Sequence, residues 1–150
     1  MGLGCPLVVF KMTRIDHIGI ATKDIEKASN FWVQVGLEAG ADHINEEQDV
    51  KIRMFYGRDK EGKKTHSKVE LIEALSESSP IAKFIDKKGV GIQQLAVSVD
   101  DIDLLISNLI KAGVRMINSE ATIGAGGHRI AFVHPESTGG VLVELVERIN

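Results

Sequence analysis

Four polar side chains interrupt apolar segments of this 150-residue sequence: His17, Glu70, Gln94 and Glu144. An ionised carboxylate in an apolar strand is costly unless it is paired or bound to a metal ion. One imidazole, two carboxylates and an amide oxygen would make a site for a divalent cation. For any one of the four alone, a solvent-facing position on a half-exposed strand explains the residue equally well.

An internal repeat relates these positions to one another. The segment around His17 is repeated around Gln94 at an offset of 94 − 17 = 77, and the segment around Glu70 is repeated around Glu144 at 144 − 70 = 74. The chain is therefore one module of about 75 residues used twice. Because two-fold pseudosymmetry would bring all four side chains to one axis, we expect them to form a shared site.

The first half is predicted to fold as a βαβββ module. Asp24 is a good N-cap, because its carboxylate can accept a backbone N–H of the first helical turn. Apolar residues at helical spacing follow, and Gly36 ends the helix. A charged loop, 57–67, joins the last two strands. The predicted strands, which are rich in β-branched or alternating apolar residues, are 15–21, 37–44, 50–56 and 68–74.

The second half repeats this plan after a linker helix, 79–88. Ser79 caps the linker helix, a proline takes its first position, and lysines lie at its C-terminal end. Asp101 caps the next helix and Gly113 ends it. A flexible glycine-rich loop is expected at 124–127. The predicted strands of this half are 92–99, 114–118, 128–134 and 141–147.

These elements predict one α+β domain, because neither module can bury a core alone. Two pseudo-symmetric βαβββ modules, about 13–75 and 90–148, are expected to form a curved mixed sheet around a metal-binding cleft within a single domain, 13–150. Residues 1–12 are predicted to be a dispensable leader, since the repeat begins directly after Met12.

Composition excludes several classes of partner. With 43% hydrophobic and 26% charged residues, the composition is typical of a soluble globular protein. The net charge of −3 offers no basic surface for nucleic acid. The single cysteine, Cys5, excludes an intramolecular disulfide and fits a reducing compartment. No apolar run approaches the roughly 18–20 residues that span a bilayer. The sequence thus predicts no nucleic-acid or membrane partner.

The remaining candidates share no spacing. The other histidines are His43, His66, His128 and His134, and His66 is expected to be solvated in the charged loop. The segment Gly124–Gly127 lacks the spacing of a phosphate-binding loop and does not open a helix. It is either a mobile hairpin loop or a source of backbone N–H groups for an acyl or phosphate oxygen.

Four segments resemble the vicinal oxygen chelate superfamily, which includes glyoxalase I, extradiol dioxygenases and antibiotic-resistance proteins. The segments are IDHIGIA (15–21), SPIAKFIDKKGVG (79–91), IGAGGHRIAFVHP (123–135) and TGGVLVEL (138–145). Within the superfamily, the last three are similar to the methylmalonyl-CoA epimerase family. The resemblance extends from residue 15 to residue 147 and implies paired βαβββ modules with a metal between them.

The resemblance implies that His17, Glu70, Gln94 and Glu144 bind a divalent metal ion, one of cobalt, zinc, nickel, manganese or magnesium. This chain departs from the family in one ligand, because Gln93 and Gln94 stand where the family usually has two histidines. An amide in place of an imidazole makes the site richer in oxygen and weakens its affinity for ions that prefer nitrogen.

The implied reaction is epimerisation of an acyl-CoA substrate, methylmalonyl-CoA, by proton transfer at the α-carbon. A metal chelated by the thioester and carboxylate oxygens would stabilise the enolate. The resemblance makes Glu47 and Glu144 the catalytic bases, although the sequence around Glu47 alone indicates a solvated acidic turn. It also implies a homodimer in a cytoplasmic setting, with the coenzyme A tail near residues 124–128.

Two alternatives keep the same fold. One is a glyoxalase-like isomerase acting on a thiohemiacetal. The other is a non-catalytic metal- or ligand-binding protein in which the substitution at Gln94 has ended catalysis. Epimerase activity separates the first alternative from the family function, and the metal content of the purified protein bears on the second.

Overall fold

The computed structural model of the chain describes residues 13–149, so the predicted leader, residues 1–12, lies outside the described part. The elements, in chain order, are β1 (Arg14–Thr22), α1 (Ile25–Gln34), β2 (Glu38–Ala39), β3 (His43–Asn45), β4 (Val50–Arg58), β5 (Lys64–Ala74), α2 (Pro80–Lys88), β6 (Gly91–Ser98), α3 (Ile102–Lys111), β7 (Thr122–Ile123), η1 (Ala125–Gly127), β8 (Arg129–Val133), η2 (Pro135–Ser137) and β9 (Val143–Glu147).

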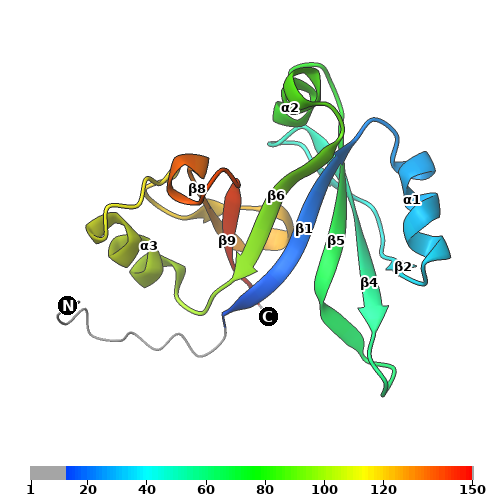
Figure 1. Ribbon diagram of the computed structural model, residues 1–150, viewed down its shortest axis with the longest axis horizontal. Coiled ribbons are helices and arrows are strands. Elements are labelled where there is room, and N and C mark those ends of the chain that lie inside the picture. Colours follow the sequence, from blue (N-terminus) through cyan, green and yellow to red (C-terminus); the bar gives the residue numbers. More distant parts are fainter. Residues whose placement is uncertain (1–12, 150) are drawn as a thin grey trace.

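Nine strands of the described residues form one curved mixed sheet (Figure 1). Its order is β2-β4-β5-β1-β6-β9-β8-β7, and β3 pairs with β4. The central strands β1 and β6 are antiparallel to each other, and each has a parallel strand on its outer side, β5 and β9 respectively. The predicted α+β class and the curved mixed sheet are confirmed.

The strand register repeats with the sequence. Gly19 of β1 pairs with Glu70 of β5, and Ala96 of β6 pairs with Glu144 of β9. These two pairs are separated by 96 − 19 = 77 and 144 − 70 = 74 residues, which are the offsets found in the sequence. The two halves are therefore related by a pseudo-two-fold axis that passes between β1 and β6.

Helices α1 and α3 cover equivalent parts of the two halves (Figure 1). Asp24 Oδ1 accepts a hydrogen bond from the Lys27 N–H at 3.1 Å, and Asp101 Oδ1 accepts one from the Leu104 N–H at 3.1 Å, so both predicted N-caps are present. The core beneath α1 contains Ile25, Phe55 and Leu71. The core beneath α3 contains Val99, Ile102, Ile106, Ala131, Val133 and Leu145.

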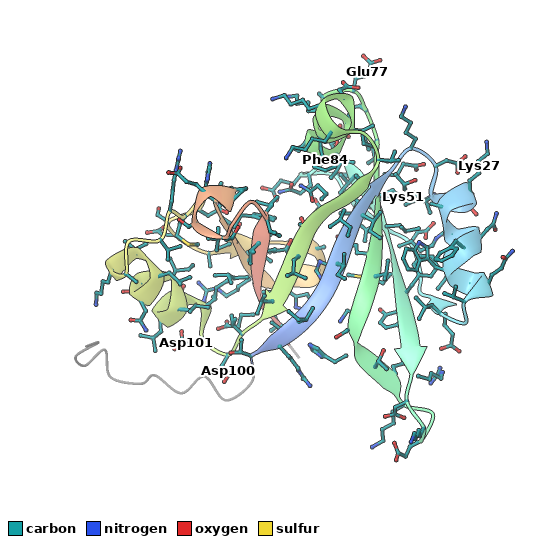
Figure 2. The ribbon with its side chains drawn as sticks, in the orientation of Figure 1. Lys27, Lys51, Glu77, Phe84, Asp100 and Asp101 are labelled. Atoms are coloured by element: carbon teal, nitrogen blue, oxygen red, sulfur yellow. The ribbon has the colours of Figure 1, made fainter. Side chains whose placement is uncertain are left out.

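The linker helix α2 packs at one end of the sheet. Ser79 accepts a hydrogen bond from the Ile81 N–H at 3.2 Å, as expected for an N-cap, and Pro80 follows it. Ile81 is buried against Ile72, and Phe84 packs on the same cluster (Figure 2). Within residues 13–149, no helix combines the length and the apolar character that crossing a membrane requires.

Two predicted segments of the first half differ from the structure. Segment 37–44 forms two short strands, β2 and β3, which both pair with β4 and are separated by residues 40–42. The predicted loop 57–67 is shorter than expected: β4 continues to Arg58 and β5 already begins at Lys64.

The second half shows three further differences. Segment 114–118 is not a strand and makes a single bridge between Met116 and Val133. Asn118 explains this, because its side-chain Oδ1 accepts the Phe132 N–H at 2.8 Å in place of a backbone carbonyl. The short strand β7 was not predicted, and the closing strand begins at Val143, two residues later than expected.

Phe55 is fully buried, whereas Phe31 on the outer face of α1 is 60% exposed. We expect Phe55→Ala to lower the free energy of unfolding by about 3–5 kcal/mol, because it leaves a cavity in the core. The matched Phe31→Ala variant should change it by less than about 1 kcal/mol. Urea denaturation measures both. Equal losses would show that the core assignment is wrong.

Candidate active site

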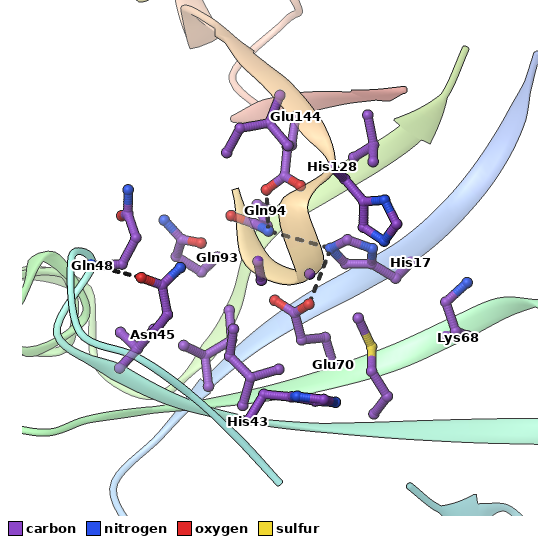
Figure 3. A pocket seen from close by; sticks show the side chains of 18 of the residues that line it. His17, His43, Asn45, Gln48, Lys68, Glu70, Gln93, Gln94, His128 and Glu144 are labelled. Carbon is purple, nitrogen blue, oxygen red and sulfur yellow. Dashed lines mark hydrogen bonds and ion pairs between the residues drawn. The ribbon is translucent and has the colours of Figure 1, made fainter. Parts of the chain in front are cut away.

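A cavity of about 530 Å³ lies between the two halves (Figure 3). Its volume is within the range of small-molecule sites, roughly 300–1,000 Å³. Part of its wall is apolar, with Ile52 and Met54 from β4 and Ile130 and Phe132 from β8. Both halves contribute to the cavity, as the repeat predicted.

The four predicted polar side chains lie together in this cavity. His17, Glu70, Gln94 and Glu144 are 3%, 6%, 6% and 9% exposed, so none of them is a surface residue. His17 Nε2 lies 3.4 Å from Glu70 Oε2 and 3.4 Å from Gln94 Nε2. Gln94 Nε2 donates to Glu144 Oε2 at 2.9 Å. They form one polar row, Glu70–His17–Gln94–Glu144 (Figure 3).

Two β-bulges aim the central side chains into the cavity. Between β1 and β6, Ile15 pairs with Val97 and His17 with Ala96, so Asp16 is an extra residue in β1. A bulge re-aims side chains that would otherwise alternate between the two faces of a sheet.

The second bulge lies at the equivalent place in β6. Gly19 pairs with Gln94 and Ile20 with Ile92, so Gln93 is the extra residue. Gln93 and Asp16 are 93 − 16 = 77 residues apart, which is the repeat offset. Both Gln93 and Gln94 line the cavity in consequence.

Asp16 holds His17 in place through a hydrogen bond with its Nδ1. Its side chain is fully buried, and its Oδ2 lies 2.7 Å from His17 Nδ1. Arg148 binds both oxygens of Asp16, with Nε donating to Oδ1 at 2.7 Å and Nη2 donating to Oδ2 at 2.5 Å. Lys68 Nζ is 3.5 Å from Oδ1. Burial opposes ionisation of Asp16, but these partners more than offset it and hold its pKa far below the usual range.

Burial and mutual charge set the ionisation of the polar row. Burial would lower the pKa of His17, but the hydrogen bond to Asp16 and the negative charges of Glu70 and Glu144 raise it instead. Burial raises the pKa of Glu70 above its ordinary value, and His17 opposes that shift. Burial also raises the pKa of Glu144, to about 7. A carboxyl group that titrates near neutral pH can both accept and return a proton.

The donor set of the polar row fits a divalent ion. Zinc-like ions bind nitrogen and oxygen at about 2.0–2.2 Å, so neighbouring ligands at right angles lie roughly 3 Å apart. The separations in the row, 3.4, 3.4 and 2.9 Å, are close to that spacing. Within residues 13–149, no three His, Cys, Asp or Glu side chains gather as a metal site by themselves. The amide of Gln94, turned to present Oε1, would complete the set.

Glu47 lies apart from this row. It is exposed in the turn that follows β3, and its neighbour Gln48 lines the cavity while Glu47 does not. Among the described residues that line the cavity, the only carboxylates are Glu70 and Glu144. The role of Glu47 as a base stays a prediction.

The glycine-rich segment 124–127 is a 3₁₀ turn beside the cavity. Gly126 and Gly127 have φ angles of 71° and 78°, in the left-handed region that favours glycine. Gly127 N–H donates to Gly124 O at 3.1 Å, and Gly126 lines the cavity. Its predicted contact with an acyl-CoA stays a prediction.

Sequence reasoning missed Lys68 and Arg148, two polar residues of the cavity, and gave no individual role to Gln93 or His128. Lys68, Gln93, His128 and Arg148 all line it, and Gln93 Oε1 is a buried oxygen for which the described residues offer no hydrogen-bond donor. His66 is not in a solvated loop as expected. It lies in β5, with Nε2 3.6 Å from Asp16 Oδ1. Lys68 carried one usable signal, since it lies two residues before Glu70 and therefore on the same face of the strand, whereas Arg148 lies just beyond the end of β9.

A comparison with family models matches residues 16–132 to the Glyoxalase/Bleomycin resistance protein/Dioxygenase superfamily. The chain belongs to this superfamily. Its relatives include the mitochondrial methylmalonyl-CoA epimerase of Bos taurus, which is 35% identical over 139 residues, or 91% of this chain and 75% of the relative. The chain is thus a homologue of methylmalonyl-CoA epimerases.

Solved structures that are similar to this chain have the same fold. A hypothetical protein from Bacillus halodurans C-125 is 40% identical, with a TM-score of 0.85 over 93% of this chain and 97% of that one. A variant of the Streptomyces coelicolor methylmalonyl-CoA epimerase, in complex with 2-nitronate-propionyl-CoA, is 35% identical, with a TM-score of 0.82 over 93% of this chain and all of that one.

The raised pKa of Glu144 predicts a pH-dependent stability. A carboxyl whose folded pKa lies above its ordinary value of 4.5 stabilises the fold while it is protonated, and this contribution is lost as the pH rises through about 7. In metal-free protein at pH 8, Glu144→Gln should therefore raise the free energy of unfolding by about 2 kcal/mol. At pH 5 the gain should be much smaller.

Urea denaturation at the two pH values measures this difference, with Glu47→Gln as the control, because a substitution at this exposed position should change the free energy of unfolding by less than about 1 kcal/mol. A gain for Glu144→Gln that is the same at pH 5 and pH 8 would contradict the assignment of a raised pKa to Glu144.

Proposed function

We propose that this protein epimerises methylmalonyl-CoA. The observation that carries the proposal is the row of four buried polar side chains, Glu70–His17–Gln94–Glu144, in the cavity between the two halves. The names of the bovine and Streptomyces relatives, and the acyl-CoA analogue bound to the latter, support the choice of substrate.

The chemistry requires a base of moderate strength in a site sheltered from water. The α-proton of a malonyl thioester is flanked by two carbonyl groups, and its removal leaves an enolate. Glu144 takes this proton as a carboxylate, and burial, which raises its pKa, favours the return of a proton. Burial keeps water from competing with that return.

The polar row would hold a divalent ion through His17, Glu70, Gln94 and Glu144. An ion bound there, one of cobalt, zinc, nickel, manganese or magnesium, would supply Lewis acidity to the thioester oxygen. Asp16 prepares His17 for this role, because a proton on Nδ1 shared with the Asp16 carboxylate leaves the lone pair of Nε2 facing the cavity.

Inversion of the α-carbon needs a second proton donor on the opposite face of the substrate. Glu47 is the residue implied by the family resemblance, and it would act only if its turn brings the exposed carboxylate to the cavity. Glu70, the other carboxylate that lines the cavity, is the candidate that the geometry favours.

Deuterium incorporation at the α-carbon of methylmalonyl-CoA in D2O tests the function, with cobalt, zinc or no metal added. We expect exchange that increases with metal and falls at least about a hundredfold in Glu144→Gln, the loss typical of a missing general base. Glu47→Gln tests the second proton donor: a comparable loss of epimerisation would assign that role to Glu47, and near wild-type activity would exclude Glu47 and leave Glu70 as the candidate in the cavity.

The same assay distinguishes two other functions. A folded, metal-loaded protein that shows no exchange but binds malonyl-CoA would be a binding protein in which Gln94 has replaced a catalytic ligand. Turnover of a thiohemiacetal without exchange would indicate a glyoxalase-like isomerase. We also propose a homodimer in the cytoplasm, and light scattering of the purified protein tests the homodimer.

A further inference from the structure

A surplus of hydrogen-bond donors marks one end of the cavity. Lys68, Arg148 and His128 line it there, and in Figure 3 Lys68 and His128 lie on the same side as His17. The side chain of Lys68 is only 10% exposed, although its ammonium group carries three donors. Burying such a group is costly unless hydrogen-bond acceptors surround it.

Asp16 is the acceptor that these cations share, and it is saturated. A carboxylate offers about four lone-pair positions. Arg148 occupies two of them through Nε and Nη2, His17 Nδ1 takes a third at 2.7 Å, and Lys68 Nζ approaches the fourth at 3.5 Å. Lys68 Nζ also donates to the His66 carbonyl at 2.9 Å. Two positive charges therefore share one negative charge, and donors remain unused on both cations.

His128 adds a donor that faces another donor. Its Nδ1 accepts the Ile149 N–H at 3.0 Å, so in the neutral ring the proton resides on Nε2. Nε2 lies 3.1 Å from Arg148 Nη1, which can only donate. Two N–H groups directed at one another are satisfied when an anionic oxygen accepts from both.

The carboxylates of the polar row do not fill this need. Glu70 Oε2 contacts His17, and Glu144 Oε2 accepts from Gln94. Among the described residues, Glu70 and Glu144 make these contacts with His17 and Gln94 and form no hydrogen bond with Lys68 or Arg148. We propose that Lys68, Arg148 and His128 form a subsite for the free carboxylate of the ligand's acyl group, in which they donate to the carboxylate oxygen that a metal in the polar row would leave uncoordinated. This inference rests on the proposed function, because it takes a malonyl-type thioester as the ligand.

The location of the subsite favours a carboxylate over a phosphate of coenzyme A. Lys68 lies two residues before Glu70 on the same face of β5, a spacing of about 7 Å along a strand. The free carboxylate of a malonyl thioester is attached directly to the α-carbon, whereas the phosphates lie beyond the pantetheine arm. Only the acyl carboxylate can reach Lys68 while the α-carbon stays beside Glu144 and Glu70.

Calorimetric titration with two ligands tests the subsite. Malonyl-CoA carries the free carboxylate, and propionyl-CoA is the same thioester without it. We expect Lys68→Met to weaken malonyl-CoA binding by about tenfold to a hundredfold, as for loss of a hydrogen bond to a charged group. Propionyl-CoA binding should change by less than about twofold, and Lys68→Arg should restore most of the affinity for malonyl-CoA.

Lys64→Met is the matched control, because Lys64 lies on the same strand, is exposed and does not line the cavity. It should leave both affinities unchanged. If Lys68→Met fails to fold, His128→Gln replaces it, and malonyl-CoA binding should then fall several-fold with propionyl-CoA binding unchanged.

Three outcomes would overturn the inference. Equal weakening of both ligands would place a phosphate of coenzyme A, common to both, at this end of the cavity. No change for either ligand would show that the donors bind no ligand group. Wild-type protein that binds neither thioester would overturn the proposed function together with the subsite, whereas wild-type binding without an effect of Lys68→Met overturns the subsite alone.

Discussion

The buried carboxylate of Asp16 is the interaction on which the site depends. It binds His17 on one side and Arg148 on the other, so it joins the first strand of the chain to residues near its end. A fully buried charge is tolerable only because cations and an imidazole surround it. These contacts fix the orientation of the His17 imidazole and attach Arg148 to the first strand. They also place the cations Lys68 and Arg148 at one end of the cavity.

The two central strands, β1 and β6, contain equivalent β-bulges. The bulges at Asp16 and Gln93 turn adjacent side chains toward the cavity, and they occupy equivalent places in the two halves. Close packing keeps the row in position: a Cβ at Gly19 would lie 2.6 Å from Gln94 Cγ, so only glycine leaves room for that side chain. The cavity is therefore a consequence of the repeat and of its two departures from regular pairing.

Much of this could be predicted from the sequence because the repeat carries long-range information. The offsets relating His17 to Gln94 and Glu70 to Glu144 predicted that distant residues meet, which local propensity cannot show. Bulges escaped prediction because they depend on the register between two strands, and a one-residue shift reverses every side chain. The importance of Lys68 and Arg148 escaped prediction because it follows from their contacts with the buried Asp16. Segment 114–118 differed from its prediction because the Asn118 side chain replaces a backbone acceptor.

Anomalous diffraction at the cobalt edge tests the central claim most directly, using crystals of chelator-treated protein grown with cobalt. If the polar row is one site, a single strong peak will lie about 2.0–2.3 Å from His17 Nε2 and from oxygens of Glu70, Gln94 and Glu144, with the Gln94 amide turned toward it. A peak elsewhere, or none while the contacts of His17 with Glu70 and Gln94 persist, would contradict the claim that the repeat has built a metal site.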